Sequence, residues 1–160
     1  MNTESHHTSA GRDAQDAAWM REALGLAAQA AEHGEVPVGA LVIRDGIVVA
    51  RAANAMRSMG AIAHAELLAI REAMDALHAE RLAGCTLVVT LEPCAMCAGA
   101  IVLARVDRVV FGAWDDKAGM CGSVGDLLRH PRLNHHPEVR AGVLAAECGA
   151  QLQAFFAARR

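Results

Sequence analysis

In the first part of the chain, apolar residues recur with the period of an α-helix. Four of them recur three or four residues apart between Asp16, a possible N-cap, and Gly34, a residue type that commonly ends helices: Met20, Leu24, Ala27 and Ala31. One apolar face on a helix favours packing against a core. We therefore expect an amphipathic helix that ends near Gly34.

Two short apolar segments come next, and the residues between them favour a tight turn. Residues 36–43 and 47–50 are separated by Arg44, Asp45 and Gly46, and an Asp-Gly pair is typical of short hairpin turns. This pattern predicts a β-hairpin. Residues 54–63 lack periodicity and are predicted to form a loop.

The rest of the chain alternates between helical and strand patterns. Residues 67–77 carry apolar side chains at helical spacing, and residues 86–90 form a short β-branched run that suits a strand covered on both faces. Helices are also expected at residues 94–104 and 144–158, strands at 109–111 and 139–143, a glycine-bearing loop at 112–125 and a helical turn at 126–130.

The order of these elements predicts the fold class. A helix, a hairpin, a helix, a strand, a helix, two strands and a helix fit an α/β protein, a three-layer α/β/α sandwich in which helices cover both faces of a mixed five-stranded sheet. Residues 1–15 are mostly small and polar, and we expect them to form a disordered leader. Residues 16–160 contain no visible repeat or linker and are predicted to form a single domain.

Composition and charge narrow the function classes. Hydrophobic residues make up 54% of the 160 residues but aromatic residues only 3%, which argues against an aromatic platform that stacks bases. The formal net charge of -3 argues against a strongly basic surface, so a polyanionic partner would have to be bound by a local group of basic residues. No apolar run is long enough to span a bilayer, and five cysteines, an odd number, fit a reducing compartment. We therefore expect a cytoplasmic protein.

Two short motifs, each at the predicted start of a helix, carry the candidate chemistry. Cys94 and Cys97 are three residues apart, which places both sulfurs on nearly the same side of a helix, and His64 is a possible third ligand to one soft metal ion. Helix N-termini lower the pKa of nearby thiols and favour the thiolates that bind zinc. The motifs predict a zinc site made by these three residues.

Three protein ligands indicate a catalytic zinc. Structural zinc sites close with four ligands, whereas a catalytic zinc keeps one coordination position for water. Glu66, two residues after His64, is then the candidate proton carrier. Other interpretations stay open: a redox-active pair of Cys94 and Cys97, a non-catalytic zinc module that binds RNA, and a closed structural zinc with Cys85, Cys121 or Cys148 as fourth ligand.

Several segments resemble a known enzyme family. The pattern His-x-Glu followed by Pro-Cys-x-x-Cys resembles the zinc deaminases that act on cytosine, adenine and guanine. Residues 35–40, 90–100 and 108–113, together with Asn134-His135, Glu147-Cys148 and Phe155-Phe156, look like the bacterial tRNA-specific adenosine deaminases. The resemblance covers residues 16–160.

The resemblance implies a cytidine-deaminase-like fold and a homodimer with one catalytic zinc per subunit. It also implies hydrolytic conversion of the wobble adenosine of a tRNA anticodon to inosine, with release of ammonia. By the matching motifs, His64, Cys94 and Cys97 would bind zinc and Glu66 would move protons. Three further residues would contact the substrate: Asn54, Ala65 and Asp115. The alternative is a guanine or cytosine deaminase acting on a free base or nucleoside, because it would share the zinc signature.

The sequence departs from the family pattern near the site. Gly60-Ala61-Ile62 precede Ala63 where the family usually has Asp-Pro-Thr, the loop is one residue shorter, and Trp114 stands where a basic residue is common. Local basic residues in the second half of the chain are candidates for RNA contact: Arg129, Arg132, His135, His136, Arg159 and Arg160.

Overall fold

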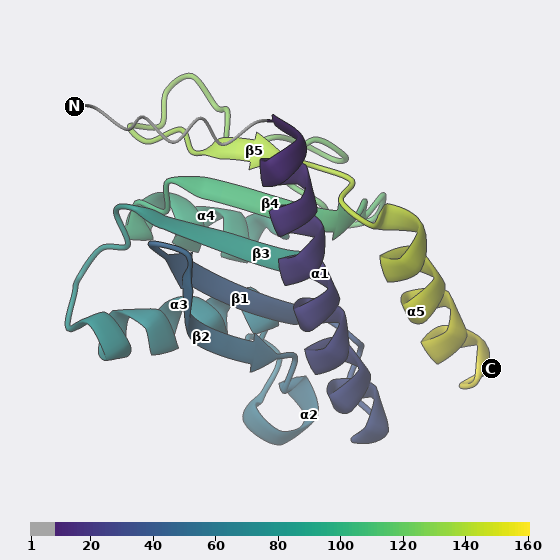
Figure 1. Cartoon of the computed structure of the whole chain (residues 1–160). Coiled ribbons are helices and arrows are strands. Elements are labelled where there is room, and N and C mark those ends of the chain that lie inside the picture. Colours follow the sequence, from purple (N-terminus) through teal and green to yellow (C-terminus); the bar gives the residue numbers. More distant parts are fainter. Residues whose placement is uncertain (1–8) are drawn as a thin grey trace.

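A mixed five-stranded sheet organises the part of the chain that the computed structural model describes, residues 9–160 (Figure 1). Its strands are β1 (Gly39–Arg44), β2 (Ile47–Ala53), β3 (Cys85–Leu91), β4 (Arg108–Ala113) and β5 (Glu138–Arg140). They lie in the order β2, β1, β3, β4, β5. β1 runs antiparallel to β2 and β3, whereas β3, β4 and β5 are parallel. The mixed sheet confirms the sequence prediction.

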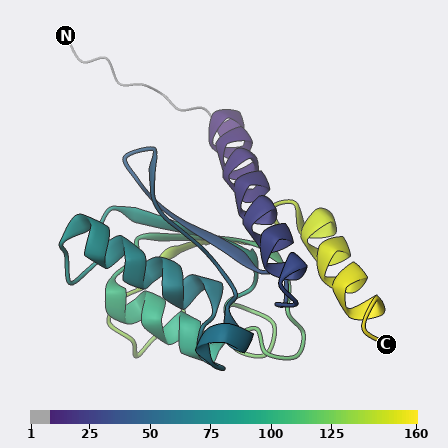
Figure 2. The same cartoon turned by 90° about the horizontal axis from the view of Figure 1, so that it is seen from below.

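Helices cover both faces of this sheet. They are α1 (Ser9–Glu32), the short α2 (Met56–Met59), α3 (Ala65–Leu77), α4 (Ala95–Ala104) and α5 (Ala145–Ala157). Figure 2 separates the layers: α1 and α5 lie on one side of the sheet, and α3 and α4 lie on the other. This confirms the three-layer arrangement. Among residues 9–160, no helix has both the length and the apolar character needed to cross a membrane.

The central strand β3 is buried on both faces, as its β-branched run predicts. Leu87 and Val89 point into the core beneath α3 and α4, whereas Val88 points into the smaller core beneath α1 and α5. Phe111, on the neighbouring β4, is fully buried in the larger core. Aliphatic side chains and alanines fill most of the remaining space, in keeping with the low aromatic content.

Two glycines shape the hairpin layer. Asp45 and Gly46 both have a positive φ, of 51° and 75°, which is the backbone of a type I′ hairpin turn and agrees with the prediction from the Asp-Gly pair. Gly39 lets α1 lie close to β1, because a Cβ there would stand 2.0 Å from the carbonyl oxygen of Ala23. The first helix is therefore pressed directly against the sheet backbone.

The structure differs from the predicted elements at three places. α1 begins at Ser9, so residues 9–15 of the expected leader are helical, and residues 1–8 lie outside the described part of the chain. Arg12 and Asp13 in this first part of α1 form ion pairs with Glu138 and Arg140 of β5, a contact between distant parts of the sequence. The predicted loop at 54–63 contains α2. Residues 126–130, predicted to form a helical turn, consist of a β-bridge residue, a bend and a non-helical turn.

Candidate active site

Helices α3 and α4 begin next to each other at the carboxyl end of β3. His64 is the residue immediately before α3 and Cys94 the residue immediately before α4, and both have the extended backbone of an N-cap. β3 leads directly into Glu92, Pro93 and Cys94. The buried strand therefore sets the position of the Cys94 thiol. The shortened loop before His64 still closes, with the His64 N–H donating to the carbonyl oxygen of Ile62 at 2.8 Å.

His64, Cys94 and Cys97 bring three ligand atoms together. The Nδ1 atom of His64 lies 3.6 Å from the Sγ atom of Cys94 and 3.6 Å from that of Cys97. A tetrahedral zinc with ordinary Zn–N and Zn–S bond lengths separates its nitrogen and sulfur ligands by about 3.6 Å. The three donors therefore fit zinc in both chemistry and spacing. A redox pair of cysteines has no need of an imidazole at equal distance from both sulfurs.

The other three cysteines do not complete a four-ligand site. Within residues 9–160, the group of possible ligand atoms within 4.8 Å of one another contains His64, Cys94 and Cys97 alone. Burial is the main reason that the pKa values of the remaining thiols are raised, which keeps them protonated. These are Cys85, Cys121 and Cys148, and all are buried in the two cores or beside them. The closed structural site is not supported.

The start of α4 favours a thiolate at Cys94. A hydrogen bond from the Cys97 side chain and the N–H groups of Met96 and Cys97 lower the pKa of the Cys94 thiol to about 5, against the opposite effect of burial. His64 acts in the same direction as these hydrogen bonds. The pKa of Cys97 is raised because this thiol donates the shared hydrogen bond and is buried. A divalent cation that takes the place of the shared proton stabilises both thiolates.

Glu66 lies in the first turn of α3, beside the ligand group but not within it. Its side chain is buried, with the residue 4% exposed. Burial raises the pKa of Glu66 to about 7, although a backbone hydrogen bond and the nearby His64 lower it. The structure thus places a carboxyl group beside the three possible zinc ligands.

A pocket of about 200 Å³ opens in front of these residues. Asn54 lies on its wall, and the Asn54 Oδ1 atom accepts a hydrogen bond from the N–H of Ala65 at 2.9 Å. This bond fixes the orientation of the Asn54 side-chain amide, because its Oδ1 atom is bound to the N–H of Ala65. Ala65 itself is fully buried and its N–H is used in that bond, so the structure does not place Ala65 on the pocket surface. The lining comprises Val36, Val38, Asn54, Met56, His64, Glu66, Leu91, Glu92, Cys94, Asp115 and Ala118.

The loop after β4 also lines the pocket. Asp115 lies in this loop, and its Oδ1 atom accepts hydrogen bonds from the N–H groups of Lys117 and Ala118 at 3.1 Å and 3.2 Å. The backbone N–H of Asp115 donates to Glu92 at 3.0 Å. Glu92 lies within the motif of residues 90–100, but no role was predicted for it. A charged residue at the end of an apolar, buried strand is the signal that could have found it.

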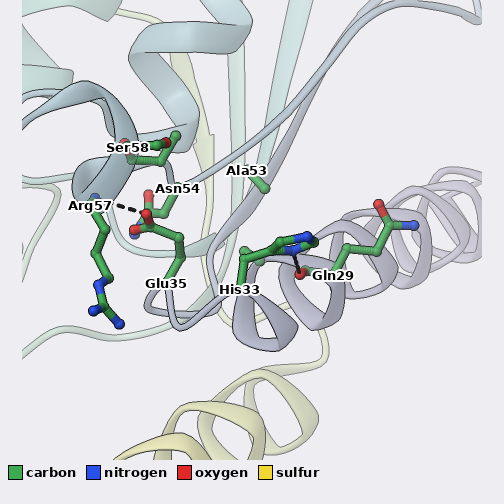
Figure 3. Close-up of a pocket in the computed structure, with 9 residues that line it drawn as sticks. Gln29, His33, Glu35, Ala53, Asn54, Arg57 and Ser58 are labelled. Carbon is green, nitrogen blue, oxygen red and sulfur yellow. Dashed lines mark hydrogen bonds between the residues drawn. The ribbon is translucent and has the colours of Figure 1, made fainter.

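A second depression, of about 670 Å³, adjoins this pocket at Asn54, which lines both (Figure 3). Glu35 is buried there, and its Oε1 atom accepts a hydrogen bond from the backbone N–H of Arg57 at 2.8 Å. The Nδ1 atom of His33 lies 2.9 Å from the carbonyl oxygen of Gln29. Glu35 thus anchors the short helix α2 against the end of α1, close to the pocket entrance.

Four of the six basic residues suggested for RNA contact have partners within the chain. Arg129 pairs with Asp126 and also donates to the carbonyl oxygen of Cys121 at 3.1 Å. The guanidinium of Arg159 stacks over the ring of Phe155 at 3.4 Å. The Nε2 atoms of His135 and His136 lie 2.6 Å and 2.8 Å from the carbonyl oxygens of Val106 and His130. Arg132 and Arg160, the remaining candidates, are exposed.

Trp114, where the family commonly has a basic residue, is half-exposed and packs edge-to-face on Phe111, with ring centroids 5.0 Å apart. Its ring also lies against Gly122, where a Cβ would stand 2.9 Å from it. The substitution therefore adds an apolar contact between β4 and the following loop.

Comparisons with known proteins agree with this geometry. The tRNA-specific adenosine deaminase of Bacillus subtilis (strain 168) is 53% identical over 143 residues, which cover 89% of each chain. A solved structure from a study of A-to-I editing by tRNA:A34 deaminases at the wobble position of transfer RNA matches with a TM-score of 0.81 and 43% identity, over 84% of this chain and 98% of that one. A guanine deaminase from Nitrosomonas europaea matches with a TM-score of 0.74 and 25% identity, over 98% of both chains.

A family model described as the cytidine and deoxycytidylate deaminase zinc-binding region matches residues 13–113. This range contains the three possible zinc ligands, Glu66 and every residue of the 200 Å³ pocket except Asp115 and Ala118. It also spans more than half of the chain. The chain belongs to the zinc-dependent family of cytidine and deoxycytidylate deaminases.

Proposed function

We propose that this chain converts the wobble adenosine of a tRNA anticodon to inosine, by zinc-dependent hydrolysis that releases ammonia. The observation that carries the proposal is the 53% identity to a tRNA-specific adenosine deaminase across 89% of both chains. At that level of identity the match extends over most of the domain and is not confined to a metal motif. The substrate is therefore a tRNA, and the reaction is hydrolysis of an exocyclic C–N bond.

The metal is held by His64, Cys94 and Cys97 in this proposal. The two thiolates and the imidazole come from the starts of two different helices, so the protein brings the donors together only when it is folded. When bound, zinc with three protein ligands lowers the pKa of a coordinated water to about 7 and thereby supplies a nucleophile at neutral pH.

Glu66 carries the protons. Its carboxylate accepts a proton from the attacking water and delivers it to N1 of the purine. It then accepts the proton of the new C6 hydroxyl and delivers it to the departing amino group. Burial in the first turn of α3 suits this role, because a shielded carboxyl exchanges protons with the substrate in preference to bulk water. Water attack at C6, followed by loss of ammonia, leaves the C6 carbonyl of inosine.

The two walls of the pocket hold the nucleoside. The Oδ1 atom of Asn54 is engaged by the N–H of Ala65, so its amino group is the part that donates to the substrate. Asp115 keeps its Oδ1 atom in the turn with Lys117 and Ala118, which leaves Oδ2 to accept a hydrogen bond from a ribose 2′-OH. Such a bond would distinguish RNA from DNA.

The test is a direct comparison of substrates. The zinc-loaded protein is incubated with an anticodon stem-loop that carries adenosine at the wobble position, and separately with guanine and with cytidine, while ammonia and inosine are measured. We expect ammonia and inosine from the stem-loop alone. Turnover of guanine or cytidine without turnover of the stem-loop would overturn the proposal in favour of a free-base or nucleoside deaminase, a class that includes one of the structural matches.

We infer further that the chain forms a homodimer through the outer face of α3 and α4. Leu103 is 79% exposed, although it is a large apolar residue and its neighbours Ile101, Val102 and Ala104 in α4 are buried. It borders a surface pocket of about 360 Å³ together with Leu67, Ile70, Met74 and Ala100. A Leu103→Glu variant is expected to sediment as a monomer where the unchanged protein sediments as a dimer. A monomeric unchanged protein would refute this interface.

We also propose that the protein works in the cytoplasm. Its proposed substrate, tRNA, is found there, and the five cysteines are all free in the structure. Fractionation of cells that produce the chain, with detection by antibody, tests this assignment. Recovery in a membrane or extracellular fraction would contradict it.

A further inference from the structure

We propose that Glu92 is a positioning residue for the substrate: its buried carboxylate holds the loop of residues 115–123 in the form that presents Asp115 to the ribose. This inference rests on the proposed function, because it names what fixes the wall of the same pocket. Glu92 follows β3 directly and is 2% exposed, so it acts through the loop and not by contact with the reacting atoms.

Glu92 uses both carboxylate oxygens on a single loop. Its Oε1 atom accepts the N–H of Asp115 at 3.0 Å, and its Oε2 atom accepts the N–H groups of Cys121 and Ser123, each at 3.0 Å. The hydroxyl of Ser123 also donates to Oε1. The four donors span nine residues of the chain. One side chain thus closes the loop at its beginning and at its end.

The loop is wrapped around this carboxylate without spare room. A Cβ on Gly119 would stand between 2.3 Å and 2.5 Å from the carboxyl atoms of Glu92, so any side chain there would force that carboxyl to move away from its loop donors. The backbone of the loop is also tied to the metal-ligand turn, because the N–H of Met120 donates to the carbonyl oxygen of Pro93 at 2.9 Å. Gly119 forms a bridge with Cys94.

Burying a carboxylate at position 92 costs free energy that an apolar residue filling the same space would not. A buried charge is unfavourable unless hydrogen bonds satisfy it, and an apolar residue of similar size would fill the same volume. Four donors from the loop offset that cost, and three of them are backbone N–H groups. The observed arrangement therefore specifies the loop conformation.

These contacts fix the position of Asp115 on the pocket wall. Its backbone is held by Glu92, and its side chain is held by the turn that it forms with Lys117 and Ala118. With both fixed, the remaining Oδ2 atom has a defined place on the pocket wall. A Glu92→Gln substitution keeps the size of the side chain but turns an NH2 group toward the loop N–H donors. The loop then loosens and the preference for a ribose over a deoxyribose falls.

The experiment compares the zinc-loaded protein with its Glu92→Gln variant by two measurements. The first is amide hydrogen exchange of residues 115–123, which does not depend on activity. The second is kcat/KM for two anticodon stem-loops that carry either adenosine or 2′-deoxyadenosine at the target position. We expect faster exchange in this loop and a fall of about tenfold in the ribose preference, the size of one charge-assisted hydrogen bond. The change should appear mainly in KM, with the zinc content unchanged.

Asp16→Asn is the matched control. Asp16 is also a buried acid that accepts two hydrogen bonds, both 2.7 Å long, from Arg108. Arg108 begins β4, whereas Glu92 follows the end of the parallel strand β3, so the control lies at the opposite end of the sheet. This variant should lose stability without any change in loop exchange or ribose preference. If Glu92→Gln does not fold, Ser123→Ala removes one donor alone and should lower the preference by about threefold.

Three results would overturn the proposal: unchanged exchange at residues 115–123, faster exchange with an unchanged ribose preference, or an equal fall in preference in the Asp16→Asn control. Failure of the proposed function would look different, because the unchanged protein would then deaminate neither stem-loop. In that case the exchange measurement would still decide whether Glu92 holds the loop.

Discussion

At the scale of single residues, two buried glutamates near the metal site have opposite electrostatic environments. Burial raises the pKa of Glu66 to about 7. Burial acts the same way on Glu92, but hydrogen bonds from Ser123, Asp115 and Cys121 outweigh it and lower the pKa of that carboxyl. The raised pKa suits Glu66 to proton transfer, whereas the hydrogen bonds to Glu92 keep that carboxyl ionised and able to hold a loop.

Replacing Glu66 by glutamine should separate proton transfer from metal binding. The amide has nearly the same shape but cannot carry a proton in the way the mechanism requires, so kcat should fall on the order of 10²-fold or more. Zinc content, measured by atomic absorption, should stay at the level of the unchanged protein, because Glu66 is not among the ligands. Glu72→Gln, a change further along α3, serves as the control. Near-normal turnover in a metal-replete Glu66→Gln protein would remove this residue from the mechanism.

The candidate metal ligands were predictable from residues because they occupy fixed offsets from helix starts. His64 and Cys94 precede two helices, and Cys97 lies one turn further, so spacing along the sequence translates into distance in space. Glu92 could not be assigned in this way. Its position after an apolar strand could mark Glu92 as unusual, but its partners are backbone N–H groups 23, 29 and 31 residues away, which the sequence does not identify.

At the scale of elements, the predicted helices and strands agree with the structure where a periodic apolar pattern ends at a residue that breaks helices or strands. β3 and α4 are examples, since a buried β-branched run ends at a proline and a helix follows. The start of α1 was missed because ion pairs from Arg12 and Asp13 to β5 hold its first part, and no local signal reports a contact across the whole chain. Asp126 joins Arg129 in a turn, which local propensity alone did not distinguish from a helix.

The packing of α1 on β1 leads to a paired prediction for two glycines. Gly39→Ala places a methyl group 2.0 Å from the Ala23 carbonyl oxygen, so helix and strand must separate, and the free energy of unfolding should fall by about 2 kcal/mol or more. Gly25 lies within α1 with open space around it, and Gly25→Ala should raise the free energy of unfolding by up to about 1 kcal/mol. Urea unfolding measures both. Equal effects of the two substitutions would contradict this close packing.

At the scale of the whole molecule, the chemistry gathers at one edge of the sheet. The parallel strands β3 and β4 both end there, and the loops that follow them carry Cys94 and Asp115. Ligand sites in α/β proteins commonly lie at the carboxyl ends of parallel strands, because helix N-termini and connecting loops converge there. The antiparallel hairpin adds Asn54 from the other side. Five separate parts of the sequence must therefore come together before the pocket exists: residues 36–38, 54–56, 64–66, 91–94 and 115–118.

Metal removal should therefore affect stability as well as activity. Zinc held by the candidate ligands would link the starts of α3 and α4, and a ligand that binds only the folded chain adds its binding free energy to folding. Treatment with a strong chelator should abolish deamination and lower Tm by about 5 to 15 °C, and added zinc should restore both. Cys97→Ala should already have the lower Tm and show no further shift with chelator. Cys148→Ala, at a buried cysteine outside the ligand group, should keep the full chelator-dependent shift. A chelator-dependent shift that survives in Cys97→Ala would show that the metal is held by other residues.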